Sequence, residues 1–295
     1  MIDLVTKFKP HVDEQFARES KKSLVTNKDF DWTGAHTIKV YKVSTSKMND
    51  YKREGKATGS RYGEVDSLDA TTEELTLKKD RSFTFTIDKL DEDETGQVLA
   101  AASALARQNR EVVIPEVDSY TYGIMAENAG AKPEALEITA ANIYDEITKA
   151  TEHLDDEEVP EEGRQLIVTP AIYRFMKKSP DIVLNTDIGE QYRIRGVVAN
   201  LDGMNVIKVP SVRLPENFGF MACHPSATVA PTKLEDYKVH KDPPGISGSL
   251  VEGRICYDAF VLENKANAIY YQAQPATEQT TESGSTTESG SNSKG

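Results

Sequence analysis

Sulfur chemistry is scarce in this sequence. Its 295 residues contain two cysteines, Cys223 and Cys256, which lie far apart along the chain. Two such thiols form no disulfide framework, and they favour a reducing compartment. There is also no CxxC, HExxH or glycine-rich phosphate loop, and the five histidines lie in five different segments without metal-ligand spacing. We therefore expect no metal site, no cofactor, no catalytic residue and no enzymatic activity.

Long hydrophobic runs are missing as well. No window approaches the ~18 uninterrupted apolar residues of a membrane span, so we expect no contact with a membrane. The opening MIDLVTKFKP lacks the apolar region of a signal peptide, so we expect no secretion. An apolar content of 38% and a charged content of 28% describe a globular protein of one or two domains.

Positive charge is in short supply, because the net charge is −13. Residues 1–60 are mildly basic, with 12 Lys/Arg against 8 Asp/Glu, whereas residues 134–163 hold 11 acids against Lys149 alone. Sequence-specific nucleic-acid binding requires a basic face that meets phosphates. The composition therefore argues against that class of function.

Three short patterns resemble functional sites, and each has a simpler structural explanation. Gly245–Ser249 resembles a nucleophile elbow, but its second glycine is misplaced and no strand leads into it. Asp155–Glu158 is contiguous and lacks the turn glycine of a calcium loop, so we interpret it as a solvated acidic loop. His224 follows Cys223, which lies in an apolar run and is therefore predicted to be a packed thiol.

The longest run of helix-favouring residues is Asp91–Asn128. It opens with four consecutive acids, which face the positive end of the helix dipole. Pro115 lacks a donor and presses on the carbonyl of Glu111, so we predict that the helix kinks or restarts there. Spacings of three and four predict one stripe, formed by Val98, Ala102, Leu105, Asn109 and Val112. We expect Val98, Ala102, Leu105 and Val112 to be the core of a long rod.

Before this rod, alternating apolar residues predict strands. They lie at His36–Val43, Thr72–Leu77 and Ser82–Ile87, around a polar segment, Ser44–Asp69. A polar loop of ~25 residues is unusual in a compact domain and is commonly functional. We interpret this region as a long projecting hairpin, preceded by an arm whose segment His11–Ser23 is too short to form a core alone.

After the rod, the pattern predicts a compact α/β unit with a sheet at its centre. A helix capped by Thr139 would bury Ile143, Ile147, Ala150 and Leu154. Thr169 and Pro170 supply the cap and first residue of a second helix, Ala171–Lys178. The expected strands are Gln165–Val168, Val197–Ala199, Met204–Val209, Phe218–Cys223, Val251–Leu262 and Ala268–Tyr271. Leu234–His240 fits a short helix or an edge strand equally well, Asp242–Gly245 is a turn, and the repeated TTESGS after Pro275 predicts a disordered tail.

This order of elements resembles that of tailed-phage major capsid proteins with the Hong Kong 97-type fold. The best local similarity is Leu166–Met176, followed by Ile114–Asp118. The resemblance covers residues 1–273 and implies an α+β fold. The implied parts are an N-arm (1–36), an E-loop hairpin (37–87), a P-domain with a long spine helix (88–132 and 246–274), an A-domain (133–245) and a disordered tail (275–295).

The resemblance implies a major capsid (head) protein that assembles from hexamers and pentamers into an icosahedral shell. Arm and loop contacts between subunits would hold the shell, which would enclose phage double-stranded DNA without sequence-specific binding. The implied partners are further copies of the chain and a portal protein; the implied location is the virion, after assembly in the host cytoplasm. Because residues 1–36 leave no room for a scaffolding segment, we expect a separate scaffolding protein.

The family's namesake joins its subunits through a Lys–Asn isopeptide bond aided by a glutamate, although most relatives do not. The resemblance makes Lys47, Lys52 and Lys56 candidate lysines here, with Asn264 or Asn267 as the acceptor and Glu263 as the aiding carboxylate.

Three other functions remain open from the sequence. An encapsulin-like nanocompartment shares the fold but packages enzymes, so the contents of purified particles distinguish it. An acidic hydrolase acting through the 152–162 loop would lose turnover when Glu157 and Glu158 are replaced. A phage tail or decoration subunit fits less well, because the chain is long and helical in its middle.

Overall fold

The computed structural model describes residues 20–30, 37–43, 45–51, 53, 61–62, 67, 70–90, 101–179, 182 and 200–276. The helices, in chain order, are η1 (Lys22–Leu24), α3 (Ala101–Gln108), η2 (Asn109–Val113), α4 (Ile114–Glu127), α5 (Ile143–Asp156), α6 (Pro170–Lys178), η3 (Ser211–Arg213), η4 (Pro225–Ala227) and η5 (Glu263–Ala268). The strands are β1 (Thr37–Val43), β2 (Ala70–Thr76), β3 (Lys79–Asp88), β4 (Gln165–Val168), β5 (Asn200–Leu201), β6 (Met204–Lys208), β7 (Phe218–Cys223), β8 (Thr228–Val229), β9 (Thr232–Lys241), β10 (Gly248–Tyr257), β11 (Phe260–Val261) and β12 (Ile269–Ala273).

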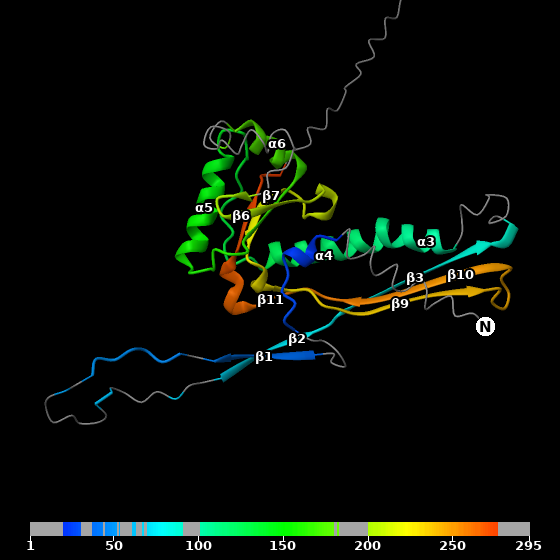
Figure 1. Cartoon of the computed structure of the whole chain (residues 1–295), viewed down its shortest axis with the longest axis horizontal. Coiled ribbons are helices and arrows are strands. Elements are labelled where there is room, and N and C mark those ends of the chain that lie inside the picture. The colour runs from blue at the N-terminus through cyan, green and yellow to red at the C-terminus, as the bar shows by residue number, and fades with distance from the viewer. Residues whose placement is uncertain are drawn as a thin grey trace, which may run out of the picture.

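The rod predicted from the sequence is the succession α3, η2 and α4, which runs along the middle of the molecule (Figure 1). The element η2 is a π-helical turn, and α4 begins with Pro115 in its first turn. The helical backbone is continuous here, because Gln108, Val113 and Ile114 all keep α-helical dihedrals, so the predicted break at Pro115 is a change of helix type rather than a new start.

The prediction that Val112 faces the core is wrong, because its side chain is 46% exposed. A π-turn closes i→i+5 hydrogen bonds, so the buried stripe advances by four residues at η2. It runs from Leu105 through Asn109 to Val113, and all three are buried. Val98 and the side chain of Ala102 lie outside the described residues.

The rod packs on a three-stranded antiparallel sheet of order β3-β10-β9. Leu105 packs with Tyr237 and Val251, while Val117 packs with Ile255 and Tyr257 further along the rod. The return strand expected at Val251–Leu262 is split, because β10 ends at Tyr257 and the short β11 follows. The segment that the sequence left undecided is a strand, β9, on the edge of this sheet among the described residues.

The second sheet has five strands in the order β12-β7-β4-β6-β5. Helices α5 and α6 cover one face of it, and the predicted stripe Ile143, Ile147, Ala150 and Leu154 is fully buried there. The other face packs against the end of α4, through residues such as Met125, and against Val25 of the N-terminal segment. The sheet therefore has a hydrophobic core on each side.

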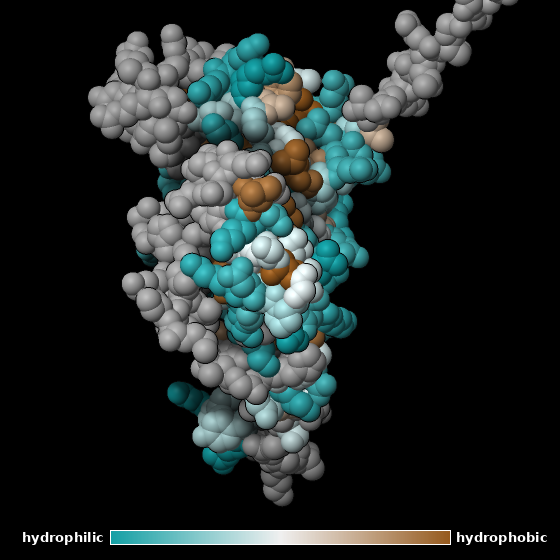
Figure 2. Space-filling model, turned by 90° about the vertical axis from the view of Figure 1, so that its right-hand side faces the viewer, coloured by the Kyte–Doolittle hydropathy of each residue, from teal (hydrophilic) through white to brown (hydrophobic). Residues whose placement is uncertain are grey.

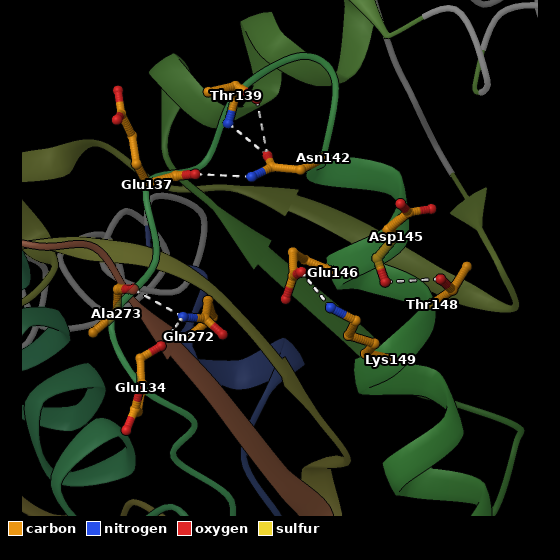
Figure 3. A network of polar contacts seen from close by, with 10 residues as sticks. All are labelled: Glu134, Glu137, Thr139, Asn142, Asp145, Glu146, Thr148, Lys149, Gln272 and Ala273. Carbon is orange, nitrogen blue, oxygen red and sulfur yellow. Dashed lines mark hydrogen bonds and ion pairs between the residues drawn. The ribbon is translucent and has the colours of Figure 1, made fainter.

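The two predicted helix caps have different outcomes. Thr169 caps α6, because its side chain accepts a hydrogen bond from the N–H of Ile172 at 3.2 Å. The helix expected after Thr139 begins later, at Ile143. Thr139 instead donates its N–H to Oδ1 of Asn142 at 2.7 Å, and so closes a turn ahead of α5 (Figure 3).

The strands β1 and β2 form a separate antiparallel pair that extends away from the body of the molecule (Figure 1). Its register runs from Thr37 opposite Thr76 to Val43 opposite Ala70. Both strands were expected, and the register places their far ends at the loop 44–69. The chain then continues from β2 into β3 of the sheet under the rod.

Several other predictions fall outside the described residues. They are the start of the rod at Asp91, most of the segment His11–Ser23, the strand Val197–Ala199, the tail after residue 276, and Lys52 and Lys56 of the loop. Within the described residues, no helix combines the length and apolar character needed to cross a bilayer. The end-on view in Figure 2 shows a mostly hydrophilic surface with small, separate hydrophobic patches.

Candidate assembly surfaces

The β1–β2 hairpin is fixed to the body by contacts along its whole length, with an ionic contact near the loop end of β1 and apolar contacts near the opposite end. Lys42 lies 3.1 Å from Glu73 and also pairs with Glu263 of η5, which raises the pKa of Lys42. Toward the other end of the strand pair, Leu75 and Leu77 pack in a cluster with Val229 of β8 and Leu262, which immediately precedes η5. The contacts set the direction in which the hairpin leaves the molecule.

The hairpin carries exposed apolar side chains on β1 and in the loop beyond it. Tyr41 is 72% exposed, Met48 98% and Tyr62 77%. The rings of Tyr51 and Tyr62 pack edge to face, with centroids 5.1 Å apart. Clustered apolar groups on a projecting element are typical of an interaction surface. Met48, Tyr51 and Tyr62 lie in the loop beyond the paired strands and belong to none of the buried clusters of the described residues.

The N-terminal segment is held at the rod by a buried polar cluster. Ser20 donates to Oδ1 of Asp118 at 2.6 Å, and Arg213 approaches Oδ2 of the same carboxylate at 3.0 Å. Burial raises the pKa of Asp118, and the contacts with Ser20, Arg213 and Lys22 oppose that shift. Lys22 is itself buried, which lowers its pKa, and it donates to Thr232 at 3.0 Å. We call Ser20, Lys22, Asp118 and Arg213 the arm anchor.

A second contact continues this attachment along the arm. The N–H of Asn27 donates to the carbonyl of Thr228 at 2.7 Å, in an isolated parallel bridge to Val229. Val25 is fully buried between the two contacts. Residues 20–30 therefore cross the junction between α4 and the five-stranded sheet, and bind to both.

The acidic loop after α5 has a structural explanation. Arg164 is 3% exposed at its side chain and pairs with Asp155 at 2.6 Å. It also donates to the carbonyls of Pro160 and Val159, at 3.0 and 2.5 Å. A single buried guanidinium thus folds the loop back on itself. Among the described residues, no group of three or more His, Cys, Asp and Glu is arranged to hold a metal ion.

The other patterns that resembled chemical sites also have structural roles. Cys223 is fully buried, and burial raises the pKa of its thiol to about 12. His224 bonds Ser226 at 2.7 Å and the carbonyl of Glu162 at 3.1 Å, and burial lowers its pKa. In the Gly245–Ser249 segment, Gly248 has φ 139°, and a Cβ there would lie 2.1 Å from the carbonyl oxygen of Ile87. Only glycine permits that approach of β10 to β3.

Some of the candidate crosslink residues are exposed, whereas others already have a partner within the chain. Lys47 is exposed on the hairpin loop, and Asn264 is exposed on η5. The Asn267 side-chain amide donates to Glu157 at 2.7 Å, whereas Glu263 pairs with Lys42 of its own chain. The structure thus brings an asparagine and a carboxylate together, but the carboxylate is Glu157, which the sequence did not indicate.

Solved structures share this arrangement, whereas sequence comparison finds no relative. No family model matches the chain, and no curated protein matches it. A chain of Mycobacterium phage Che8 has TM-score 0.67 and 18% identity, and the match covers 86% of this chain and 90% of that one. A chain in the capsid structure of the cyanophage P-SCSP1u has TM-score 0.63 and 14% identity, covering 86% and 87%.

A crystal structure of a virus-like particle from Pyrococcus furiosus is also similar, with TM-score 0.59 and 11% identity over 92% of this chain and 100% of that one. At these identities the comparisons establish the fold. The chain has the fold found in the cyanophage capsid, and the predicted α+β class is confirmed.

Proposed function

We propose that this chain is a major capsid (head) protein, which assembles into an icosahedral shell around phage double-stranded DNA. The observation that carries the proposal is the match to a phage capsid over nearly the whole length of both chains. A shell subunit needs surfaces that cross onto its neighbours, and the projecting hairpin with its exposed Tyr41, Met48 and Tyr62 supplies one. The virion is then its location, and the host cytoplasm its site of assembly.

We assign the parts of the capsid fold with two changes to the ranges expected from the sequence. The arm is 1–36, the E-loop hairpin is 37–87 and the spine helix lies in 88–132. The pairing of β9 with β10 favours placing residues 232–245 with the P-domain rather than the A-domain. The pairing of β12 with β7 favours the A-domain for residues 269–273.

Removing the hairpin's outer part is expected to prevent assembly without unfolding the subunit. Val43 and Ala70 are opposite each other, so an Asn-Gly turn replacing residues 44–69 joins them with the twist that a two-residue hairpin requires. We expect soluble subunits with an unchanged circular dichroism spectrum and no rings or shells in sedimentation velocity. Wild-type assembly by the truncated chain would contradict a role of the hairpin between subunits.

An encapsulin-like nanocompartment is the alternative, and the virus-like particle supports it with a lower TM-score than either phage structure. The two functions differ in what the chain does alone. A capsid protein that depends on a separate scaffolding protein forms rings and irregular shells when it is expressed alone. The portal protein and the DNA are then supplied by other parts of the phage assembly system. A nanocompartment forms uniform closed shells that contain protein, so closed, regular particles from this chain alone would refute the separate scaffold.

We expect the subunits of the mature particle to remain unlinked. Glu263 is engaged by Lys42 and Asn267 by Glu157, so the exposed Asn264 is left as the acceptor for Lys47, Lys52 or Lys56 without its aiding carboxylate. A denaturing gel of mature particles should show a single band at 32.6 kDa. A ladder of multiples that disappears in Asn264→Asp or Asn267→Asp would instead establish the crosslink.

A further inference from the structure

Three lysines gather where α6, β6 and the N-terminal arm meet. The Nζ atoms of Lys177 and Lys208 lie 4.9 and 5.2 Å from the same ring centroid, that of Tyr173. The Nζ atom of Lys21 donates to the backbone carbonyl of Lys208 at 2.7 Å. The three lysines are exposed, whereas Tyr173 is buried beneath them. We call Lys21, Lys177 and Lys208 the basic edge.

The charge of the basic edge is not neutralised within the described part of the chain. No carboxylate there lies within 4.0 Å of any of the three ammonium groups. Burial, followed by the charges of Lys208 and Arg213, lowers the pKa of Lys21, as expected where like charges are held close together. In addition, α6 carries Arg174, Lys177 and Lys178 and no acidic residue. A chain of net charge −13 thus concentrates unpaired positive charge at one place.

The opposite charge gathers on the outer face of α5. Asp145, Glu152 and Asp156 are exposed and lie at helical spacings of seven and four, so they share the side opposite the buried stripe. Lys149, between them, is paired with Glu146 at 2.6 Å, and Asp145 points away from that pair (Figure 3). We call Asp145, Glu152 and Asp156 the acidic face.

Helix α5 and residue Lys208 lie at different strands of the five-stranded sheet. Helix α5 contacts β12 and β7, whereas Lys208 is the last residue of β6, three strands away from β12. At about 4.8 Å per strand the separation is roughly 14 Å. In Figure 1, α5 forms the left side of this part of the molecule, and α6 lies to its right. Helices α5 and α6 are neighbours, but no carboxylate of the acidic face lies within 4.0 Å of a lysine of the basic edge in the same chain.

We propose that the basic edge of one subunit docks on the acidic face of α5 in a second copy of the chain, head to tail around a ring. Contacts between two different patches of one chain close into rings when the rotation permits. Complementary charges orient the approaching subunits and exclude the reversed arrangement, in which like charges meet. The proposal rests on the proposed function, since it describes a contact within an assembled ring.

Charge reversal tests this contact. The variant K177E/K208E makes the basic edge acidic, and D145K/D156K makes the acidic face basic. We expect each variant to remain folded and its yield of rings or shells to fall at least about tenfold in sedimentation velocity. The chain with all four substitutions restores the attraction with reversed signs, so its assembly should return. The control K233E/K241E changes the net charge equally at the two exposed ends of β9, and should assemble normally.

Each other outcome contradicts the contact. Normal assembly by both double variants, or no recovery in the fourfold variant, overturns it while leaving the shell function in place. If K233E/K241E also failed to assemble, the reduced assembly of K177E/K208E would be due to the change in net charge and not to the loss of a specific contact. A different result would be that the wild-type chain binds duplex DNA, with only K177E/K208E losing that binding while still assembling. Such a result would make the basic edge a surface that binds phosphate groups. Absence of rings and shells from the wild-type chain would instead count against the proposed function.

Discussion

Replacing Leu105 with aspartate should abolish the soluble, assembly-competent subunit. Leu105 is fully buried between the rod and the sheet, where it packs with Tyr237 and Val251. Losing a buried leucine costs about 2–5 kcal/mol, and burying an unpaired carboxylate costs several more. The free energy of unfolding of a domain is about 5–15 kcal/mol, so this one substitution is expected to remove most or all of it.

Val112 provides the matched control, because it lies on the same rod and is 46% exposed. We expect Val112→Asp to be soluble, with an unfolding midpoint in urea close to that of the wild type. Soluble expression and urea unfolding of the two variants measure the difference. Normal shells from Leu105→Asp would mean that this rod is not the element on which the subunit is built.

Replacing Asp118 with asparagine is expected to cost about 3 kcal/mol, because removing one partner of a buried ionic group leaves the others uncompensated. The Asp118 carboxylate is 2% exposed and faces Arg213 at 3.0 Å and Ser20 at 2.6 Å, with buried Lys22 nearby. The variant should also release the arm, so trypsin should cut faster at Lys21 and Lys22.

Glu116 supplies the control, since it stands on the same helix and pairs with Arg81 at the surface, and the side-chain oxygen of a glutamine there can still accept the hydrogen bond from the Tyr257 hydroxyl. Glu116→Gln should change the free energy of unfolding by less than about 1 kcal/mol. An unchanged stability in Asp118→Asn would mean that Asp118 is protonated in the folded chain, and that hydrogen bonds alone hold the arm.

Regular patterns in the sequence predicted most of the elements. Alternation located β1, β2 and β3, and the stripe Ile143, Ile147, Ala150 and Leu154 located the buried side of α5. These predictions succeed because burial on one face imposes a period of 2 or 3.6 directly on the residues. The sequence of the edge strand β9 did not distinguish a strand from a helix. Its outer residues, such as Asp236 and Lys238, are charged, and only part of its inner face packs against a helix.

The failures arise where a contact depends on distant residues. Val112 was placed in the core by a period that η2 interrupts, and no local residue marks a π-turn. Asn109 was placed correctly in the stripe, and its side-chain amide is buried without a hydrogen-bond partner among the described residues.

The sequence also did not predict which charged residues are buried. No sequence pattern marked Asp118 or Arg164 as buried, and the loop Asp155–Glu158 was interpreted without the arginine that folds it. Their partners lie elsewhere in the fold: Ser20 and Arg213 are each more than 90 residues from Asp118. Only the tertiary structure brings such groups together. The arm anchor and the basic edge therefore became visible in the structure alone.

Electron microscopy of the purified chain tests the central claim most directly. A shell subunit that acts through its hairpin and arm should form rings of five or six copies and curved or irregular shells, at concentrations where the hairpin-truncated chain remains monomeric. A uniform population of monomers at every concentration would contradict the account.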